Sequence, residues 1–372
     1  AKKANLEIES TTDRREVLKG AGFVISTIAV GGIDAHNLDV EISKKYGIYT
    51  SIGDTVGPQG FSRALRQIPA TVDVCRDMES LCPNALFINE ANPLSGICSA
   101  VHRATKIKVI GLGSSRVREH LAQLVAANPE QTEVVLTGIN HLVWILAFRV
   151  KGEDAYPSLI KRLSQFGPVR SKLFEIYGII PAIADEHVAE FYSFFFTEAS
   201  GFGKKWGLSV YPGDTIYGPR WREEALKRID KWLGPGDHFE ELLRPDVGEK
   251  SYALDIIETI SSGRTKLYDT INIPNEGSVT NLPQGAILET STLVGSLGIR
   301  GIYVGELPKG VAATLYSRIL QQELTVDAAL SGDRKLALQA LLADPMISSI
   351  EVAERLLADL LEANSKYLPQ FQ

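Results

Sequence analysis

The sequence has few cysteines, only three in 372 residues. They are Cys75, Cys82 and Cys98, and such an odd, sparse set gives no disulfide framework. Cys75 and Cys82 are seven residues apart, so they can share a helix face as two small buried apolar residues. A protein without disulfides suits a reducing compartment, and we therefore expect a cytoplasmic location.

Long apolar runs and an excess of positive charge are also missing. No stretch reaches 18 consecutive apolar residues, so we expect no membrane span. The formal net charge of -6 offers none of the basic surface that nucleic acid binding requires. The composition is that of a globular protein, and the charge fits a small molecule as the partner.

What the sequence has is an alternation of strand and helix patterns in its first third. Buried strands are predicted at residues 23–30, 85–89 and 106–111. Helices are predicted at 12–20, with Thr12 as a cap, and at 60–68, 71–81 and 94–104. This alternation predicts a parallel sheet covered on both faces, so residues 1–125 indicate part of a doubly wound, Rossmann-type α/β domain.

The remaining residues, 126–372, predict a mixed α+β domain for substrate binding and oligomerisation. An apolar segment occupies 141–150, strands are expected at 267–273 and 301–304, and helices at 251–262 and 310–342. Residues 200–245 read as surface helices and loops. The last helix, 350–363, is amphipathic, with its leucines inward at Leu356, Leu357, Leu360 and Leu361.

Polar and glycine-rich pairs follow each predicted strand of the first domain. They are Gly31-Gly32, Asn92-Pro93 and Gly113-Ser114. Because ligands of parallel sheets bind at the carboxyl ends of the strands, we expect a site at this edge. The two asparagines there, Asn89 and Asn92, either serve a turn through their amides or bind sugar hydroxyl groups.

A glycine-rich loop, residues 53–60, enters a helix that carries Arg63 and Arg66. The free N–H groups of a helix N-terminus can hold an anion. A plain turn followed by a helix explains the glycines equally well, and both arginines could be solvated.

Two further segments contain titratable residues. His141 lies between Asn140 and an apolar run that includes Trp144, which fits either a buried imidazole or a metal ligand. Residues 185–190 contain Asp185, His187 and Glu190, either as a general acid/base element or as a solvated helix face.

Together these segments resemble glycoside hydrolase family 4, across nearly the whole chain. The strongest likeness lies in residues 53–69, 77–93, 138–144, 185–191, 272–289 and 307–310, and it is closest to the alpha-galactosidase and alpha-galacturonidase branch. The resemblance implies a redox route to glycoside cleavage with NAD and a divalent metal such as manganese. NAD oxidises the sugar at C3, a base removes the C2 proton, the leaving group departs, water adds and the ketone is reduced.

The same resemblance implies residue roles. His141 would be a metal ligand, with Asn140, Asn89, Asn92, Arg63 and Glu190 at the sugar. Gly31, Asp54 and Asn92 would face the cofactor. Asp185, His187 and Ser114 are the candidates for acid–base catalysis. For the base that removes the C2 proton, the resemblance leaves three candidates unranked, which are Asp185, His187 and Glu190.

The chain departs from the family at two places. Gly113 stands where the family has a metal-binding cysteine, and Ser114 stands where it often has a proposed acid. Without the cysteine, the guanidinium of Arg116 could replace the positive charge of the metal ion beside an enediolate or a carboxylate. Alternatively, the activity could have been lost. The strand and glycine-rich phosphate loop that open the family are missing, and the first residue is not Met. Either the protein extends further at its N-terminus, which we expect, or the chain cannot bind NAD normally.

We therefore expect an NAD-dependent glycosidase acting on alpha-galactosides or alpha-galacturonides, assembled as a homo-oligomer. One alternative is a sugar-sensing relative that has lost metal-assisted turnover. Another is an NAD-dependent sugar dehydrogenase, since its sheet would be of the same general type.

Overall fold

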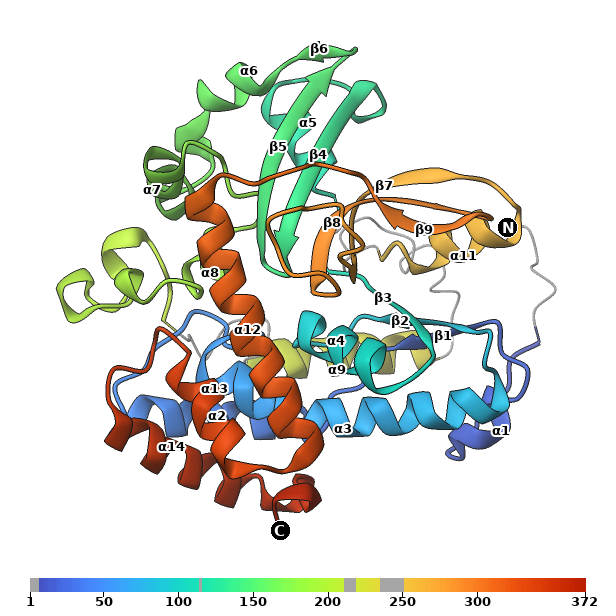
Figure 1. Ribbon diagram of the computed structural model, residues 1–372, viewed down its shortest axis with the longest axis vertical. Coiled ribbons are helices and arrows are strands. Elements are labelled where there is room, and N and C mark those ends of the chain that lie inside the picture. Colours follow the sequence, from blue (N-terminus) through green and yellow to red (C-terminus); the bar gives the residue numbers. More distant parts are fainter. Residues whose placement is uncertain (1–6, 114–115, 211–218, 235–250) are drawn as a thin grey trace.

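The computed structural model describes residues 7–113, 116–210, 219–234 and 251–372 (Figure 1). Within these residues one mixed sheet runs in the order β1-β2-β3-β7-β8-β4-β5-β6, with β9 paired to β8. Its strands are β1 Phe23–Ser26, β2 Leu86–Asn89, β3 Lys108–Gly111, β4 Thr132–Ile139, β5 Leu142–Val150, β6 Glu153–Asp154, β7 Lys266–Pro274, β8 Ile287–Gly295 and β9 Gly298–Gly301.

The direction of the strands changes at β7. The first three strands are parallel, as the sequence predicts, and β7 pairs antiparallel to β3. All later pairs are antiparallel. The Rossmann-type expectation is confirmed, and the strands of the second half continue the same sheet.

The helices cover both faces of the parallel strands. Phe87 packs with Met78 and Leu94 on one face, and Ile88 packs with Ile256 on the other. The helices are α1 Arg14–Leu18, α2 Gly32–Lys45, α3 Gly57–Leu81, α4 Leu94–Ala104, α5 Val117–Leu124, α6 Tyr156–Ile160, α7 Pro168–Tyr177, α8 Asp185–Ala189, α9 Pro219–Leu233, α11 Ala253–Ser261, α12 Lys309–Ser331, α13 Arg334–Leu342 and α14 Ile350–Ala363.

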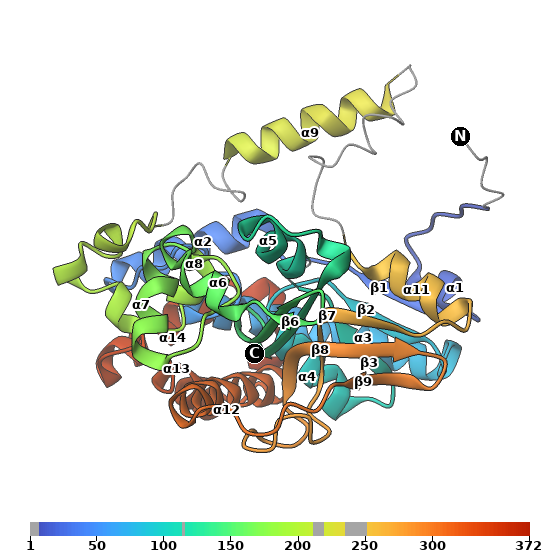
Figure 2. The same cartoon turned by 90° about the horizontal axis from the view of Figure 1, so that it is seen from above.

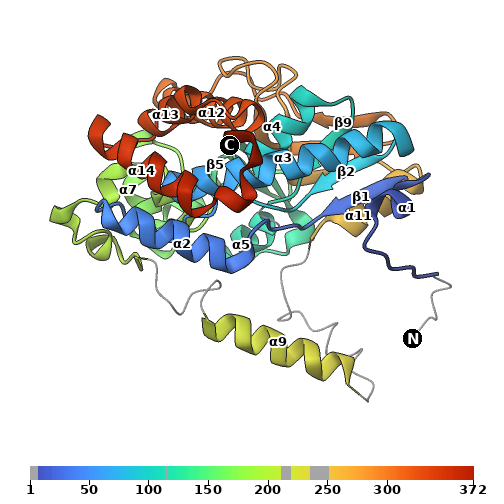
Figure 3. The same ribbon diagram turned by 90° about the horizontal axis from the view of Figure 1, so that it is seen from below.

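The C-terminal helices return to the first domain. Helix α12 packs on α3, α4 and α13, and α14 packs on α2 and α13. Figures 2 and 3 show α12 on the side of the molecule opposite to α9. The four leucines predicted to face inward from α14 are all buried. No helix in the described part of the chain is both long and apolar enough to cross a membrane.

Helix α3 was predicted as two helices, and this was wrong. Pro69 lies inside one continuous helix. Proline has no N–H group, so it cannot bond the carbonyl of Leu65 one turn earlier. The side-chain amide of Gln370, from the C-terminus, donates to that carbonyl at 2.9 Å. A contact more than 300 residues away thus allows the helix to continue.

Several smaller expectations change as well. Gly31-Gly32 begin helix α2, which the sequence did not predict, instead of closing a strand. Asp13, not Thr12, caps the first helix. The strand expected at 301–304 lies at Gly298–Gly301. The three cysteines are free and buried, as expected.

Candidate active site

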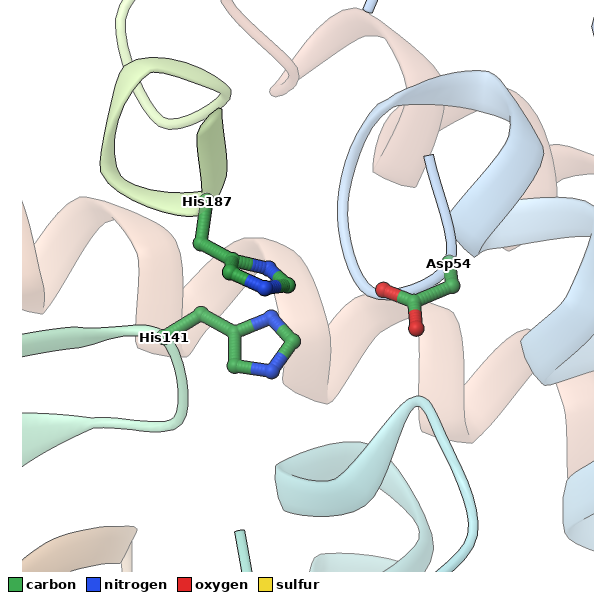
Figure 4. A group of neighbouring side chains, drawn as sticks. All are labelled: Asp54, His141 and His187. Atoms are coloured by element: carbon green, nitrogen blue, oxygen red, sulfur yellow. The ribbon is translucent and has the colours of Figure 1, made fainter. Parts of the chain in front are cut away.

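Three segments bring Asp54, His141 and His187 together (Figure 4). Asp54 lies in the loop before α3, His141 at the tip of the β4–β5 hairpin, and His187 in α8. One possible donor atom from each side chain lies within 4.8 Å of the other two. Sequence analysis had given these residues three separate roles, whereas the structure places them in one group.

The hairpin fixes the position of His141. Ile139 pairs with Leu142, so Asn140 and His141 form a two-residue turn. His141 adopts a φ of 70°, which is unusual for a residue with a side chain. Its ring centroid lies 4.0 Å from that of His187. Burial, followed by the neighbouring His187, lowers the pKa of His141 to about 3, so its ring is neutral near pH 7 and can act as a ligand.

The Asp54 carboxylate is buried and connects the group to the edge of the sheet. Its Oδ2 atom accepts a hydrogen bond from the Asn92 amide at 2.7 Å, and its Oδ1 atom accepts one from the Thr55 hydroxyl at 2.9 Å. The carbonyl of Asn92 accepts a bond from Arg63 Nε at 3.0 Å. Asn92, Arg63 and Asp54 therefore form one connected network at the end of β2.

Asn89 is differently placed from Asn92. Its side chain is fully buried, donates to the Ala91 carbonyl at 2.9 Å and accepts from the Ala91 N–H at 3.3 Å. Asn89 thus holds the turn after β2, which accounts for this asparagine without a ligand.

Glu190 positions the loop that carries Asp54. Its Oε1 atom accepts from the backbone N–H groups of Ile52 at 2.5 Å and Gly53 at 2.8 Å. Its Oε2 atom is buried and has no hydrogen-bond partner among the described residues. Burial is the main cause that raises the pKa of Glu190 to about 8, and the nearby Asp54 adds to the rise.

Position 113, where the resemblance implies a metal-binding cysteine, is closed in this chain. A Cβ atom on Gly113 would lie 2.5 Å from Asn140 Nδ2 and 3.2 Å from a carboxylate oxygen of Glu289. The Asn140 amide donates to Glu289 at 2.9 Å, and both side chains are fully buried. Sequence analysis did not assign Glu289 to the site. An acidic residue inside an apolar strand was the signal that could have identified it.

Asp185 is engaged away from this group. Its carboxylate accepts from the backbone N–H groups of Val169 at 2.9 Å and Arg170 at 3.1 Å, at the N-terminus of α7. It also accepts from Arg170 Nε at 3.1 Å. These contacts give Asp185 a structural role as a helix cap.

The other predicted residues are less informative. Gly31 has a φ of 81°, and a Cβ atom there would meet Ala35 at 2.6 Å, so backbone conformation and packing account for the glycine. Ser114 lies outside the described residues. Arg116 has a φ of 81° and precedes α5, and its suggested charge-replacing role stays a prediction.

The donors present fit a divalent metal ion. Two imidazoles and one carboxylate are common ligands of borderline cations. The Nδ1 atom of His141 is buried and has no hydrogen-bond partner among the described residues, so this nitrogen is available to bind a metal ion. The hydrogen bond between Asp54 and Asn92 connects the group to the carboxyl end of β2, the edge at which α/β proteins bind their ligands.

Comparison with known proteins identifies the family. Residues 1–126 match the description "Family 4 glycosyl hydrolase", and residues 136–347 match "Family 4 glycosyl hydrolase C-terminal domain". The chain belongs to this family, which confirms the resemblance seen in its motifs.

Named relatives and a solved structure agree with this assignment. The chain is 31% identical to an alpha-galactosidase of Bacillus subtilis over 99% of this chain and 86% of the relative. It is 32% identical to an alpha-galacturonidase of Thermoanaerobacterium saccharolyticum over 95% of this chain and 81% of the relative. The 6-phospho-beta glucosidase of Thermotoga maritima, solved with manganese, NAD+ and glucose-6-phosphate, matches with a TM-score of 0.76 and 26% identity. That match covers 95% of this chain and 83% of the other.

Proposed function

We propose that this chain hydrolyses alpha-galactosides or alpha-galacturonides with the help of NAD and a divalent metal ion such as manganese. The names of the two relatives support the substrates, and the ligands of the Thermotoga maritima structure support the cofactors. The observation that carries the proposal is the convergence of Asp54, His141 and His187 at the end of β2, in contact with Asn92.

Different residues of the chain would bind the cofactor and the metal ion. When bound, NAD would take and return a hydride at the sugar ring, and the metal would stabilise negative charge on the sugar oxygens. Gly31 and Asn92, which follow β1 and β2, would lie along the cofactor, and His141 would hold the metal. The sequence contains no GxGxxG loop, so these residues supply only part of a dinucleotide site.

The sugar would be held by the polar side chains around this group. The Asn140 Oδ1 atom is buried and has no partner among the described residues, so it can accept a hydrogen bond from a sugar hydroxyl. Arg63 keeps the Asn92 turn in place through the Asn92 carbonyl. Asn140 would therefore help to orient the sugar, and another side chain must remove the proton.

Two of the three candidate bases fit the geometry. Asp185 is used by α7, which leaves His187, in the central group, and Glu190, next to the Asp54 loop. Either could remove the C2 proton, because His187 lies against His141 and Glu190 is bonded to the loop that carries Asp54.

The test is hydrolysis of nitrophenyl alpha-galactoside and alpha-galacturonide by the full chain in heavy water, with NAD and manganese. We expect nitrophenol release that requires NAD, and deuterium at C2 of the product sugar. The corresponding beta-galactoside serves as the control substrate. Release without NAD and without deuterium in the ring would overturn the proposal.

A sugar-binding relative without turnover is the second candidate. The specific observation in its favour is the closed thiolate position beside Gly113. Sugar binding by calorimetry, with no nitrophenol release, would support this candidate. Net formation of NADH with free sugars would instead indicate a dehydrogenase.

We further propose a cytoplasmic homo-oligomer. The three free, buried cysteines suit a reducing compartment. Helix α9 exposes Leu226, Ile229 and Leu233, a stripe that a partner subunit could cover. Light scattering after size-exclusion chromatography tests the assembly, and a monomer would contradict it.

A further inference from the structure

The group formed by Asp54, His141 and His187 has the geometry of a complete metal site. All three donor atoms lie within 4.8 Å of one another, so a single ion placed between them could touch all three. Figure 4 shows the His187 ring over the His141 ring, with Asp54 facing both from the opposite loop. Mn²⁺, Co²⁺ and Zn²⁺ all accept imidazole nitrogen and carboxylate oxygen.

Packing alone does not account for His141. The residue holds a φ of 70°, a conformation that costs a residue with a side chain on the order of 1 kcal/mol. Its buried Nδ1 atom has no hydrogen-bond partner among the described residues. Backbone strain and an unsatisfied buried nitrogen both destabilise the protein, and a bound cation would satisfy the nitrogen.

A cysteine at position 113 has no room for its side chain. A side chain at position 113 would begin 2.5 Å from the Asn140 amide, and that amide is bonded to Glu289. The Asn140–Glu289 pair thus occupies the space that a side chain at position 113 would need. A metal held by His141 must take its other protein ligands from a different direction.

We propose that this chain binds one divalent cation through Asp54, His141 and His187, without any sulfur ligand. The inference deepens the proposed function by giving the metal ligands, and it rests on that function only in treating the ion as catalytic. Nitrogen and oxygen donors favour Mn²⁺, Co²⁺ and Zn²⁺ over the soft cations that a thiolate attracts.

This ligand set also narrows the choice of base. An imidazole nitrogen that binds a metal cannot accept a proton, so His187 would be a ligand and not the base. Among the three original candidates, Asp185 caps α7 and Glu190 remains. The Glu190 Oε2 atom is buried and has no partner among the described residues, so it retains an unused acceptor position.

Cobalt titration of the metal-free full chain tests the inference without NAD or sugar. We expect one bound Co²⁺ by calorimetry, and an absorption spectrum that lacks the thiolate-to-cobalt charge-transfer band. His187→Gln and Asp54→Asn should each weaken binding by about 100-fold or more, since even partners behind the ligands change affinity by about 10- to 100-fold. The exposed residues His102 and Asp230 supply matched controls, His102→Gln and Asp230→Asn, which should bind like the parent.

Several outcomes would overturn the inference. These are no cobalt binding by the folded parent chain, a thiolate band in its spectrum, or undiminished binding by either ligand variant. The parent spectrum requires no variant, so it remains decisive if a substitution prevents folding. Metal binding without hydrolysis would leave this inference standing and remove the proposed function, whereas NAD-dependent hydrolysis with undiminished cobalt binding by His187→Gln would do the reverse.

Discussion

Replacing Gly113 by cysteine would introduce the side chain that the family resemblance implies at this position, and we expect it to destabilise this protein. The new Cβ atom would lie 2.5 Å from Asn140 Nδ2, closer than any tolerated contact, so Asn140 must move. Its 2.9 Å bond to the buried Glu289 would break. Overpacking costs about 1–3 kcal/mol, and leaving a buried acceptor without its donor costs a similar amount.

These contributions overlap, and a combined loss of about 3 kcal/mol is expected. An unfolding entropy of about 2.1 cal/mol/K per residue gives about 0.8 kcal/mol/K for a chain of this length. Gly113→Cys should therefore lower Tm by about 4 °C in scanning calorimetry. Gly22→Cys is the matched control, because a Cβ atom there meets nothing within 4 Å.

Two results would refute this reasoning. One is a Tm for Gly113→Cys within about 1 °C of the Gly22→Cys value, since a loss near 3 kcal/mol is expected. The other is a thiolate-to-cobalt band in Gly113→Cys without loss of stability, which would mean that Asn140 gives way freely.

Three further predictions concern buried carboxyl groups. In the parent protein the buried Arg66 lies 2.8 Å from Asp39, and Asp39→Asn removes its counter-charge. The free energy of unfolding, measured by calorimetry, should fall by about 3–5 kcal/mol. An unchanged Tm would contradict this prediction. Asp185→Asn should cost about 1–2 kcal/mol through the α7 cap. The Asp185→Asn substitution should leave the affinity for cobalt unchanged. A large loss of kcat in a stable, folded Asp185→Asn variant would contradict the purely structural role and make Asp185 a catalytic residue. Burial raises the pKa of Glu190 to about 8, so the folded state holds this proton more tightly than the unfolded state. In metal-free buffer the parent should therefore lose stability relative to Glu190→Gln by up to about 1.4 kcal/mol per pH unit between about pH 5 and 8, and a constant difference would refute this.

Local patterns predicted the fold where burial is regular along the chain. Helix α4 begins and ends at the predicted residues, and the leucines of α14 face the core as expected. The continuity of α3 could not be predicted, because it depends on Gln370 bonding the carbonyl that Pro69 leaves free. Tertiary contacts of this kind leave no local signal.

The same limit applies to the site. The motifs contained nearly all of its residues, but their spacing along the chain could not bring Asp54 to His141 and His187. It also could not separate Asn89, which holds a turn, from Asn92, which bonds Asp54. That distinction depends on where each side chain points at the end of β2.

The turn between β4 and β5 sets opposite demands on residue 141. Its φ of 70° suits glycine, which has no Cβ atom to crowd the backbone, yet the chain keeps an imidazole there. Exchanging His141 for glycine should therefore give a higher Tm than exchanging it for alanine, while both variants lose the ion. At position 141, glycine suits the backbone best and histidine suits metal binding best. Selection for a higher Tm alone would therefore favour glycine and lose the metal ligand.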